Sequence, residues 1–511
     1  MTQPHGIWTM NRREFLQGLI AAGTIAGVGA GASGHAMAAS RPFGGLPLDE
    51  NLVKQILARA MARGGEYAEL FGEDSLSTNV SLDEKKIRSA SVGATRGIGI
   101  RVIKGKKVGY AYSDDLSADA LLRTADTSAL IAAGSGSWTP QPLQPQMARS
   151  LSPIKMNPAD VPVKKKVEML LTADEVARGY DERITQVMGR FVDAGTYRLM
   201  VNTEGQFLED YDVLARLSVY LIASDGNDRR TGFYGGGGHV GFEHYTTFSP
   251  ELIAKTAAKS AVATLGAIDA PTGEQSVVLS NGWSGVLLHE AIGHGLEADF
   301  NRKGASLYSG KIGQKVASEL CTVIDDATIP NARGTFNMDD EGGMPQRKVL
   351  IENGVLRGYM FDRLNAQLMG GDFKSTGSGR RESFRHYPIP RMSNTFLAPG
   401  QSTKDDVIKS VKKGFYAKMF GGGQVDISNG NFVFEVSEGY LIENGEITKP
   451  VKNAMLTGVG PVALQNVTMV ADDAELDPGI GTCGKNGQLV PVGVGLPHLR
   501  IDKMTVGGTG A

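Results

Sequence analysis

A hexapeptide in the second half of the chain contains the residue types of a hydrolytic zinc site. It reads His289-Glu290-Ala291-Ile292-Gly293-His294. Two neutral imidazoles can bind zinc, and a carboxylate between them can take a proton from water that the metal activates. The common zincin spacing has two residues between the glutamate and the second histidine, whereas this chain has three. The motif predicts a metal site of unusual geometry, with two ordinary, partly buried histidines as the alternative.

The separation of His289 and His294 does not fit a regular helix. Residues four apart in an α-helix differ by roughly 40° around the axis, whereas residues five apart differ by about 140°. A π-type turn, with its i→i+5 hydrogen bond, would return both imidazoles to one face. Gly293 makes such a distortion less costly, because glycine tolerates backbone angles that other residues avoid. We therefore expect an irregular helical turn at Ile292 and Gly293.

Two histidines alone do not complete a catalytic zinc site, which usually has three protein ligands. The residues leave four candidates for the third ligand: Glu297, Asp299, His386 and Cys483. Glu297 and Asp299 are also suited to orient an imidazole N–H from outside the metal's ligand set. The chain has two cysteines, which could instead pair as a disulfide in an oxidising compartment. Cys321 lies in an apolar run, which is typical of an inert core thiol.

Four cationic or titratable side chains follow within a few residues of one another. They are Arg380, Arg381, Arg385 and His386. In a hydrolase, such groups can stabilise a developing oxyanion or hold substrate carbonyl groups. The alternative is a solvated basic face with no role in binding.

The N-terminus has the pattern of a twin-arginine export signal over residues 1–38. Arg12 and Arg13 precede a weakly apolar, Gly- and Ala-rich stretch, and Ala36-Met37-Ala38 follows as a small-residue cleavage site. An uncleaved membrane anchor is the alternative, but Gly and Thr interrupt the apolar run, and no later segment approaches the roughly 18 apolar residues of a membrane span. We expect export by the twin-arginine translocase to the periplasm, or a cytoplasmic location if the signal is not used.

Composition and patterning indicate an α+β protein of several domains. The chain has 511 residues and a net charge of −2, so no basic surplus suggests nucleic-acid binding. We expect a small N-terminal α/β domain over 47–135, a middle α+β region over 156–270, and a large antiparallel β-rich domain over 275–508 that carries the metal-site helix. Residues 235–238 are all glycine and predict a flexible loop. Two Asn-Gly pairs, at 353–354 and 444–445, predict β-hairpins.

Beyond the hexapeptide, the chain resembles the TldD/PmbA family of metalloproteases, and its TldD branch in particular, over about residues 50–508. The resemblance also rests on the stretches 338–342, 379–395, 422–426 and 481–488. It implies that His289, His294 and Cys483 hold zinc and that Glu290 is the catalytic carboxylate. A thiolate is a good soft ligand for zinc, which agrees with that assignment.

The resemblance also implies substrates and partners. It implies hydrolysis of small or unfolded peptides by a dimer, formed with a PmbA- or TldE-like paralogue that lacks the metal motif or with a second copy. A non-catalytic peptide-binding or scaffold subunit is the alternative. The leader departs from the family pattern, since the better-known members look cytoplasmic.

Overall fold

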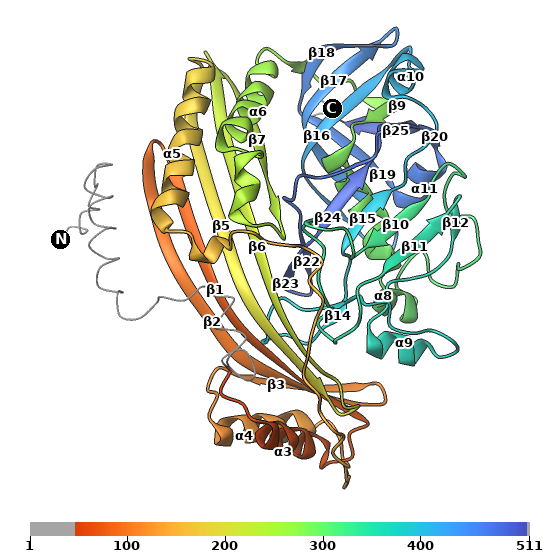
Figure 1. The fold of residues 1–511 in the computed structure, drawn as a ribbon. Coiled ribbons are helices and arrows are strands. Elements are labelled where there is room, and N and C mark those ends of the chain that lie inside the picture. Colours follow the sequence, from red (N-terminus) through yellow and green to blue (C-terminus); the bar gives the residue numbers. More distant parts are fainter. Residues whose placement is uncertain (1–45, 508–511) are drawn as a thin grey trace, which may run out of the picture.

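The computed structural model describes residues 46–507, and one seven-stranded sheet dominates the first half of this range (Figure 1). The predicted leader lies outside the described residues. The strands run in the order β3-β2-β1-β5-β6, with β7 and the short β4 both on β6. Their bounds are β1 (Tyr67–Asp83), β2 (Lys86–Lys104), β3 (Lys107–Ser113), β4 (Gln146–Met147), β5 (Ile184–Asn202), β6 (Phe207–Asp225) and β7 (Asp228–Gly238). Strands from the expected N-terminal and middle regions therefore share one sheet.

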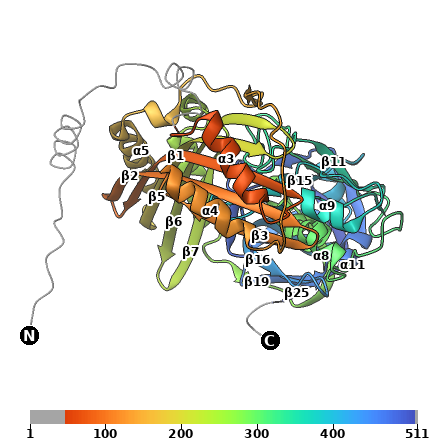
Figure 2. The same ribbon diagram turned by 90° about the horizontal axis from the view of Figure 1, so that it is seen from below.

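The two faces of this sheet have opposite chemistry. Along β6 from Val213 to Ala223, the odd-numbered residues, such as Leu217 and Val219, are buried and apolar, while the even-numbered residues are only partly buried and include Arg216 and Ser218. Four helices cover the apolar face: α3 (Glu50–Met61) and α4 (Ala118–Ala129) at one end, and α5 (Val163–Tyr180) and α6 (Pro250–Ala263) at the other. Figure 2, seen from below, shows α3 and α4 side by side across the end of the sheet that is lowest in Figure 1. The polar face is left to meet the C-terminal region.

The C-terminal region contains two larger sheets, of eight and six strands. The first uses β8 (Ile268–Asp269), β9 (Gly273–Leu279), β16 (Lys413–Val425), β17 (Asn431–Glu443), β18 (Glu446–Lys452), β19 (Ala454–Val459), β20 (Val467–Val470) and β25 (Leu499–Gly507). The second uses β10 (Val323–Asp326), β11 (Arg347–Glu352), β12 (Val355–Leu356), β15 (Asn394–Leu397), β21 (Glu475–Leu476) and β24 (Gly493–Leu496). Shorter elements are α8 (Ala298–Arg302), α9 (Arg363–Met369), α10 (Lys404–Lys409), α11 (Gly460–Gln465), β13 (Gly379–Arg380) and β14 (Ile389–Pro390).

Pairing in this region corrects the expectation of an antiparallel domain. β16 pairs with β9, β15 with β24, and β18 with β8 in parallel, so the sheets are mixed. In the eight-stranded sheet, β16 also pairs with β17, which closes the ring β16-β9-β25-β19-β17. Its apolar interior includes Phe415 and Phe434, and the same core contains Leu288 and Ile292 from the motif helix. The predicted metal-site helix is thus anchored on this closed sheet.

The glycine run at 235–238 is not a flexible loop; that prediction is wrong. These glycines end β7 and are buried. A Cβ on Gly236 would lie 2.5 Å from the Pro478 carbonyl oxygen, and one on Gly238 would overlap the Asn331 carbonyl. Glycine therefore lets C-terminal loops pack directly on the strand backbone.

Both Asn-Gly hairpins are confirmed. The first joins β11 to β12 and the second joins β17 to β18. Asn353 and Gly354 have φ values of 47° and 79°, and Asn444 and Gly445 have 54° and 82°. Two successive positive φ values are what a tight hairpin turn of this kind requires.

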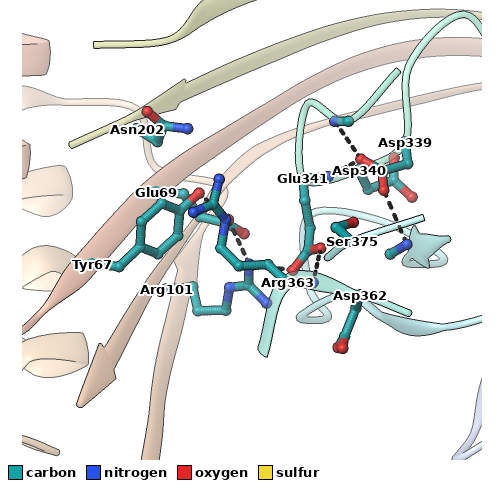
Figure 3. Close-up of polar contacts among 12 residues, drawn as sticks. Tyr67, Glu69, Arg101, Asn202, Asp339, Asp340, Glu341, Asp362, Arg363 and Ser375 are labelled. Carbon is teal, nitrogen blue, oxygen red and sulfur yellow. Dashed lines mark hydrogen bonds and ion pairs between the residues drawn. The ribbon is translucent and has the colours of Figure 1, made fainter. Parts of the chain in front are cut away.

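Buried ion pairs join the polar face of the sheet to the C-terminal region (Figure 3). Arg101 on β2 lies 2.6 Å from Glu69 on β1 and 2.7 Å from Glu341, and all three side chains are buried. Arg381 contacts the other oxygen of Glu69 at 2.7 Å. Such buried charges are tolerated only when they are paired. Over residues 46–507, the helices are too short or too polar to cross a membrane.

Candidate metal centre

The motif helix contains one π-helical turn. His289–Gly293 forms this turn after the short helix α7 (Val286–Leu288), and a 3₁₀ turn, His294–Leu296, follows it. The backbone N–H of His294 donates to the carbonyl of His289, which closes the i→i+5 bond. The two imidazole rings lie 5.1 Å apart between centroids and are nearly perpendicular. The predicted irregular turn at Ile292 and Gly293 is confirmed.

Gly293 serves a different purpose from the one expected. Its φ and ψ are −55° and −52°, which are ordinary helical angles that any residue adopts. A Cβ at this position would instead overlap the sulfur of Met392, a fully buried side chain. Glycine is needed here for space, not for backbone freedom.

Cys483 reaches the histidines from a separate β-hairpin. The hairpin consists of β22 (Thr482–Lys485) and β23 (Gln488–Pro491), joined by Asn486 and Gly487 in left-handed conformations. Cys483 Sγ lies 3.3 Å from His294 Nε2. One donor atom from each of His289, His294 and Cys483 lies within 4.8 Å of the others, and all three residues are buried. Of the four candidate third ligands, the structure brings Cys483 to the pair.

This donor set fits a catalytic zinc site. Two imidazole nitrogens and one thiolate are ligands that zinc prefers, and three protein ligands leave a fourth position open. Tetrahedral bonds of about 2.0–2.3 Å place ligand atoms roughly 3.5 Å apart, close to the 3.3 Å between Cys483 Sγ and His294 Nε2. His289 Nδ1 is buried without a hydrogen-bond partner in the described chain, which is costly unless that nitrogen itself has a ligand or partner.

Charged groups around the site lower the pKa values of the Cys483 thiol and the Glu297 carboxyl group. Burial by itself would raise the pKa of the Cys483 thiol, but His289 and His294 outweigh it and lower the pKa to about 4. Glu297 Oε2 lies 2.9 Å from His294 Nδ1, so Nε2 is the nitrogen turned toward Cys483. Burial opposes ionisation of Glu297 as well, but Lys485 and His294 lower its pKa to about 2. Glu297 therefore orients an imidazole N–H, as the sequence suggested.

Two residues in the site were not singled out from the sequence. Lys485 lies 3.0 Å from Glu297 and 2.8 Å from Asp299, so Asp299 pairs with a lysine instead of an imidazole. Arg391 donates to the carbonyl oxygen of Cys483 at 2.7 Å and is fully buried. The available signal for Lys485 was its position two residues after Cys483, which places both on one face of a strand.

Glu290 is partly exposed, whereas the three metal-ligand candidates are buried. Its side chain is 22% exposed, and Oε2 lies 3.9 Å from His294 Nε2. The carboxylate is thus beside the ligand atoms but beyond hydrogen-bond distance of that nitrogen. Such a group is free to interact with a small molecule bound at the site.

The four cationic candidates do not form one cluster. Arg380 is buried, donates to the carbonyl of Met392 at 2.7 Å, and lies near enough to Cys483 to interact electrostatically. Arg381 is engaged by Glu69 and stacks over Phe71, which ties it to the sheet. Arg385 is half-exposed near Asp114, and His386 forms hydrogen bonds with Ser383 and Arg381 in its own loop.

Comparison with known proteins places this architecture in a family. Models for domain 1, the central domain and the C-terminal domain of the PmbA/TldA metallopeptidases match residues 68–132, 157–265 and 272–508. A "Metalloprotease TldD homolog" from Haemophilus influenzae is 46% identical over 458 residues, covering 88% of this chain and 94% of the relative. A metalloprotease from Methanothermobacter thermautotrophicus is 34% identical over 450 residues, covering 87% of this chain and 96% of its own.

The solved structures share the fold. TldE from Thermococcus kodakarensis superposes with a TM-score of 0.72 at 20% identity, covering 89% of this chain and all of that one. At this identity the similarity concerns the fold alone. Together with the sequence relatives, it shows that the chain belongs to the PmbA/TldD family of metallopeptidases.

Proposed function

We propose that this protein is a zinc-dependent metallopeptidase in which His289, His294 and Cys483 hold the metal. The observation that carries the proposal is the convergence of two imidazoles and a low-pKa thiol within 4.8 Å, beside a partly exposed carboxylate. When bound, zinc would supply a Lewis acid that polarises a peptide carbonyl and acidifies water.

Glu290 is the group proposed to move the proton. It would take a proton from the attacking water and pass it to the leaving amine, the role of a general base and then a general acid. Its partial exposure and its position 3.9 Å from His294 Nε2 support this role, because substrate and water must reach it.

Arg380 is the best placed of the four cationic residues to stabilise the oxyanion. It is buried near Cys483 and donates to the Met392 carbonyl, and Asp340 and Asp325 act on it electrostatically without forming an ion pair with it in the described chain. A buried guanidinium without a direct carboxylate partner can stabilise negative charge that develops beside it. Arg381, Arg385 and His386 remain weaker candidates for substrate binding.

The substrate proposed is a small or unfolded peptide in an extended conformation. On its β9 side, β16 is paired only from Gly414 to Ala417, while its residues 421–424 are exposed. Trp283, in the turn that leads into the motif helix, donates to the carbonyl of Phe420 on this strand. An open strand edge beside the helix can accept an extended peptide through backbone hydrogen bonds.

Partnership and location are further parts of the proposal. The similarity in fold to TldE supports a dimer with a PmbA- or TldE-like paralogue or with a second copy. Export by the twin-arginine translocase to the periplasm rests on residues 1–38. A non-catalytic scaffold or peptide-binding subunit is the rival function, and the complete set of His289, Glu290, His294 and Cys483 argues against it.

Replacing Glu290 by Gln tests the mechanism. The variant is expected to keep stoichiometric zinc but to lose cleavage of an unfolded test peptide by about 10²- to 10⁴-fold, because the proton acceptor is gone. The measurements are metal analysis of purified full-length protein and peptide cleavage with and without a chelator.

Glu446→Gln, at an exposed position on β18, is the matched control and should behave as wild type. Absence of zinc from the wild type, or full turnover in Glu290→Gln, would overturn the proposal. Zinc without cleavage in the wild type would favour the binding function or a missing partner subunit.

A further inference from the structure

We infer that Lys485 is a positioning residue that holds the Cys483 hairpin and the His294 helix in register for the metal. The inference rests on the proposed metal site. It concerns how two segments nearly two hundred residues apart in sequence form one ligand set.

The hairpin presents Cys483 and Lys485 on the same face. They are alternate residues of β22, and both are buried. Thr482, before them, and Gly484, between them, are exposed. Successive strand residues point to opposite faces, so the thiol and the ammonium group leave the hairpin in the same direction. Cys483 meets His294 Nε2 at 3.3 Å, and Lys485 meets the chain just beyond that histidine.

Lys485 has all of its donors occupied. Its ammonium group lies 3.0 Å from Glu297 Oε2, 2.8 Å from Asp299 Oδ1 and 3.0 Å from the Pro390 carbonyl oxygen. An ammonium group has three N–H donors, so these three acceptors satisfy it completely. Its side chain is 4% exposed and lies over the ring of Phe300. A lysine fixed in this way cannot move without moving its strand.

One atom of Glu297 connects Lys485 to the metal ligand. Glu297 Oε2 contacts both His294 Nδ1, at 2.9 Å, and Lys485 Nζ, at 3.0 Å. The glutamate side chain is fully buried, and its other oxygen has no hydrogen-bond partner in the described chain. Without the ammonium group this buried carboxylate would lose the cation that stabilises it most and would be left with His294 and the weaker effect of Arg391, which is unfavourable. Lys485 thus stabilises the Glu297 carboxylate, which binds His294 Nδ1 and so turns Nε2 of that ring toward Cys483.

Lys485→Met tests this role, because it keeps most of the side-chain volume and removes the charge. We expect zinc affinity, measured by competition with a chromogenic chelator, to fall about 10- to 100-fold, as is typical when a residue that orients a metal ligand is lost. In the cobalt-substituted protein, the thiolate-to-cobalt absorption band should weaken or shift. Lys449→Met, at an exposed position on β18, is the matched control and should leave both readouts unchanged.

A double variant keeps the test decisive if Lys485→Met folds poorly. Glu297→Gln with Lys485→Met removes the buried carboxylate together with its ammonium partner, so Glu297 is not left as an unpaired ion, and Asp299 is the one carboxylate of the cluster that loses its lysine. The double variant should bind zinc as weakly as Glu297→Gln alone, because the two residues act through one contact and their effects are not additive. Wild-type zinc affinity with an unchanged cobalt band in Lys485→Met or in the double variant, or additive losses, would overturn the inference. If the wild type bound no zinc, the proposed function itself would fail.

Discussion

At the scale of single residues, the two cysteines occupy opposite chemical environments. Burial raises the pKa of Cys321 to about 12, and no cation among residues 46–507 opposes this effect. At Cys483, burial acts in the same direction, but the two imidazoles lower the pKa to about 4. One thiol is therefore an inert core group, and the other is a thiolate at neutral pH in the metal-free protein.

This contrast predicts the pH dependence of thiolate absorbance in the ultraviolet. Metal-free wild type and Cys321→Ser should show the thiolate signal at neutral pH and lose it as the pH falls toward about 4. Cys483→Ser should lack it. Because the folded-state pKa is depressed, the stabilisation from ionised Cys483 is fully present above its ordinary pKa and is lost as pH falls through the folded value. A wild type without the signal at neutral pH would contradict this reading.

At the residue level, the sequence pointed to the candidate ligands and to Glu297, but not to Lys485 and Arg391, which contact them. The histidine pair and Glu290 were visible as a motif. Cys483 needed the resemblance to a family, because its distance in sequence hides its proximity in space. Lys485 and Arg391 resemble ordinary solvated charges until the hairpin and its neighbours are placed, since burial of a cation depends on tertiary packing and not on local pattern.

At the scale of elements, the motif helix and the segment after β14 fit together through Gly293. The missing side chain leaves room for the sulfur of Met392. Gly293→Ala should therefore destabilise the protein by about 1–3 kcal/mol through overpacking. Because the added methyl group lies directly before His294, zinc affinity should also fall. Denaturant unfolding and chelator competition measure the two effects.

Truncation of Met392 supplies the control for that contact. Met392→Ala alone should cost about 2–5 kcal/mol, since it removes a fully buried side chain. In that background, Gly293→Ala should cost little, because the sulfur it would overlap is absent. An equal cost in both backgrounds would mean that the helix needs glycine for its backbone angles, contrary to the ordinary φ and ψ at this position.

Elements with strong local signals could be predicted, and elements fixed by distant contacts could not. The π turn follows from the five-residue histidine spacing, and the two Asn-Gly hairpins follow from their turn chemistry. The run at 235–238 looked like a loop, because glycine is a poor strand former. It is strand because C-terminal loops pack on its backbone, which no local pattern reports.

At the scale of the whole molecule, the sheets joined regions that the sequence appeared to separate. The expected N-terminal region ends at 135 and the middle region begins at 156, yet β1 and β5, one from each region, are paired over fifteen consecutive residue pairs. The parallel pairs of the C-terminal region were likewise hidden, since periodicity marks a strand but does not identify its neighbour. The presence of both helices and strands and the β-rich C-terminal half could be predicted from the sequence.

The buried charges between the sheet and the C-terminal region should contribute strongly to the stability of the whole molecule. Arg101 neutralises Glu69 and Glu341, which have 0% and 3% side-chain exposure (Figure 3). Arg101→Met would leave Glu341 without its charged partner, and such a change typically costs about 3–5 kcal/mol. Arg96→Met, on the same strand but with a half-exposed ion pair to Asp74, should cost at most about 1 kcal/mol. Denaturant unfolding compares the two variants, and zinc affinity of the folded Arg101→Met protein should remain unchanged, because this network has no contact with the metal ligands. Equal losses of stability would mean that the interface is held by its apolar contacts and that the charges add little.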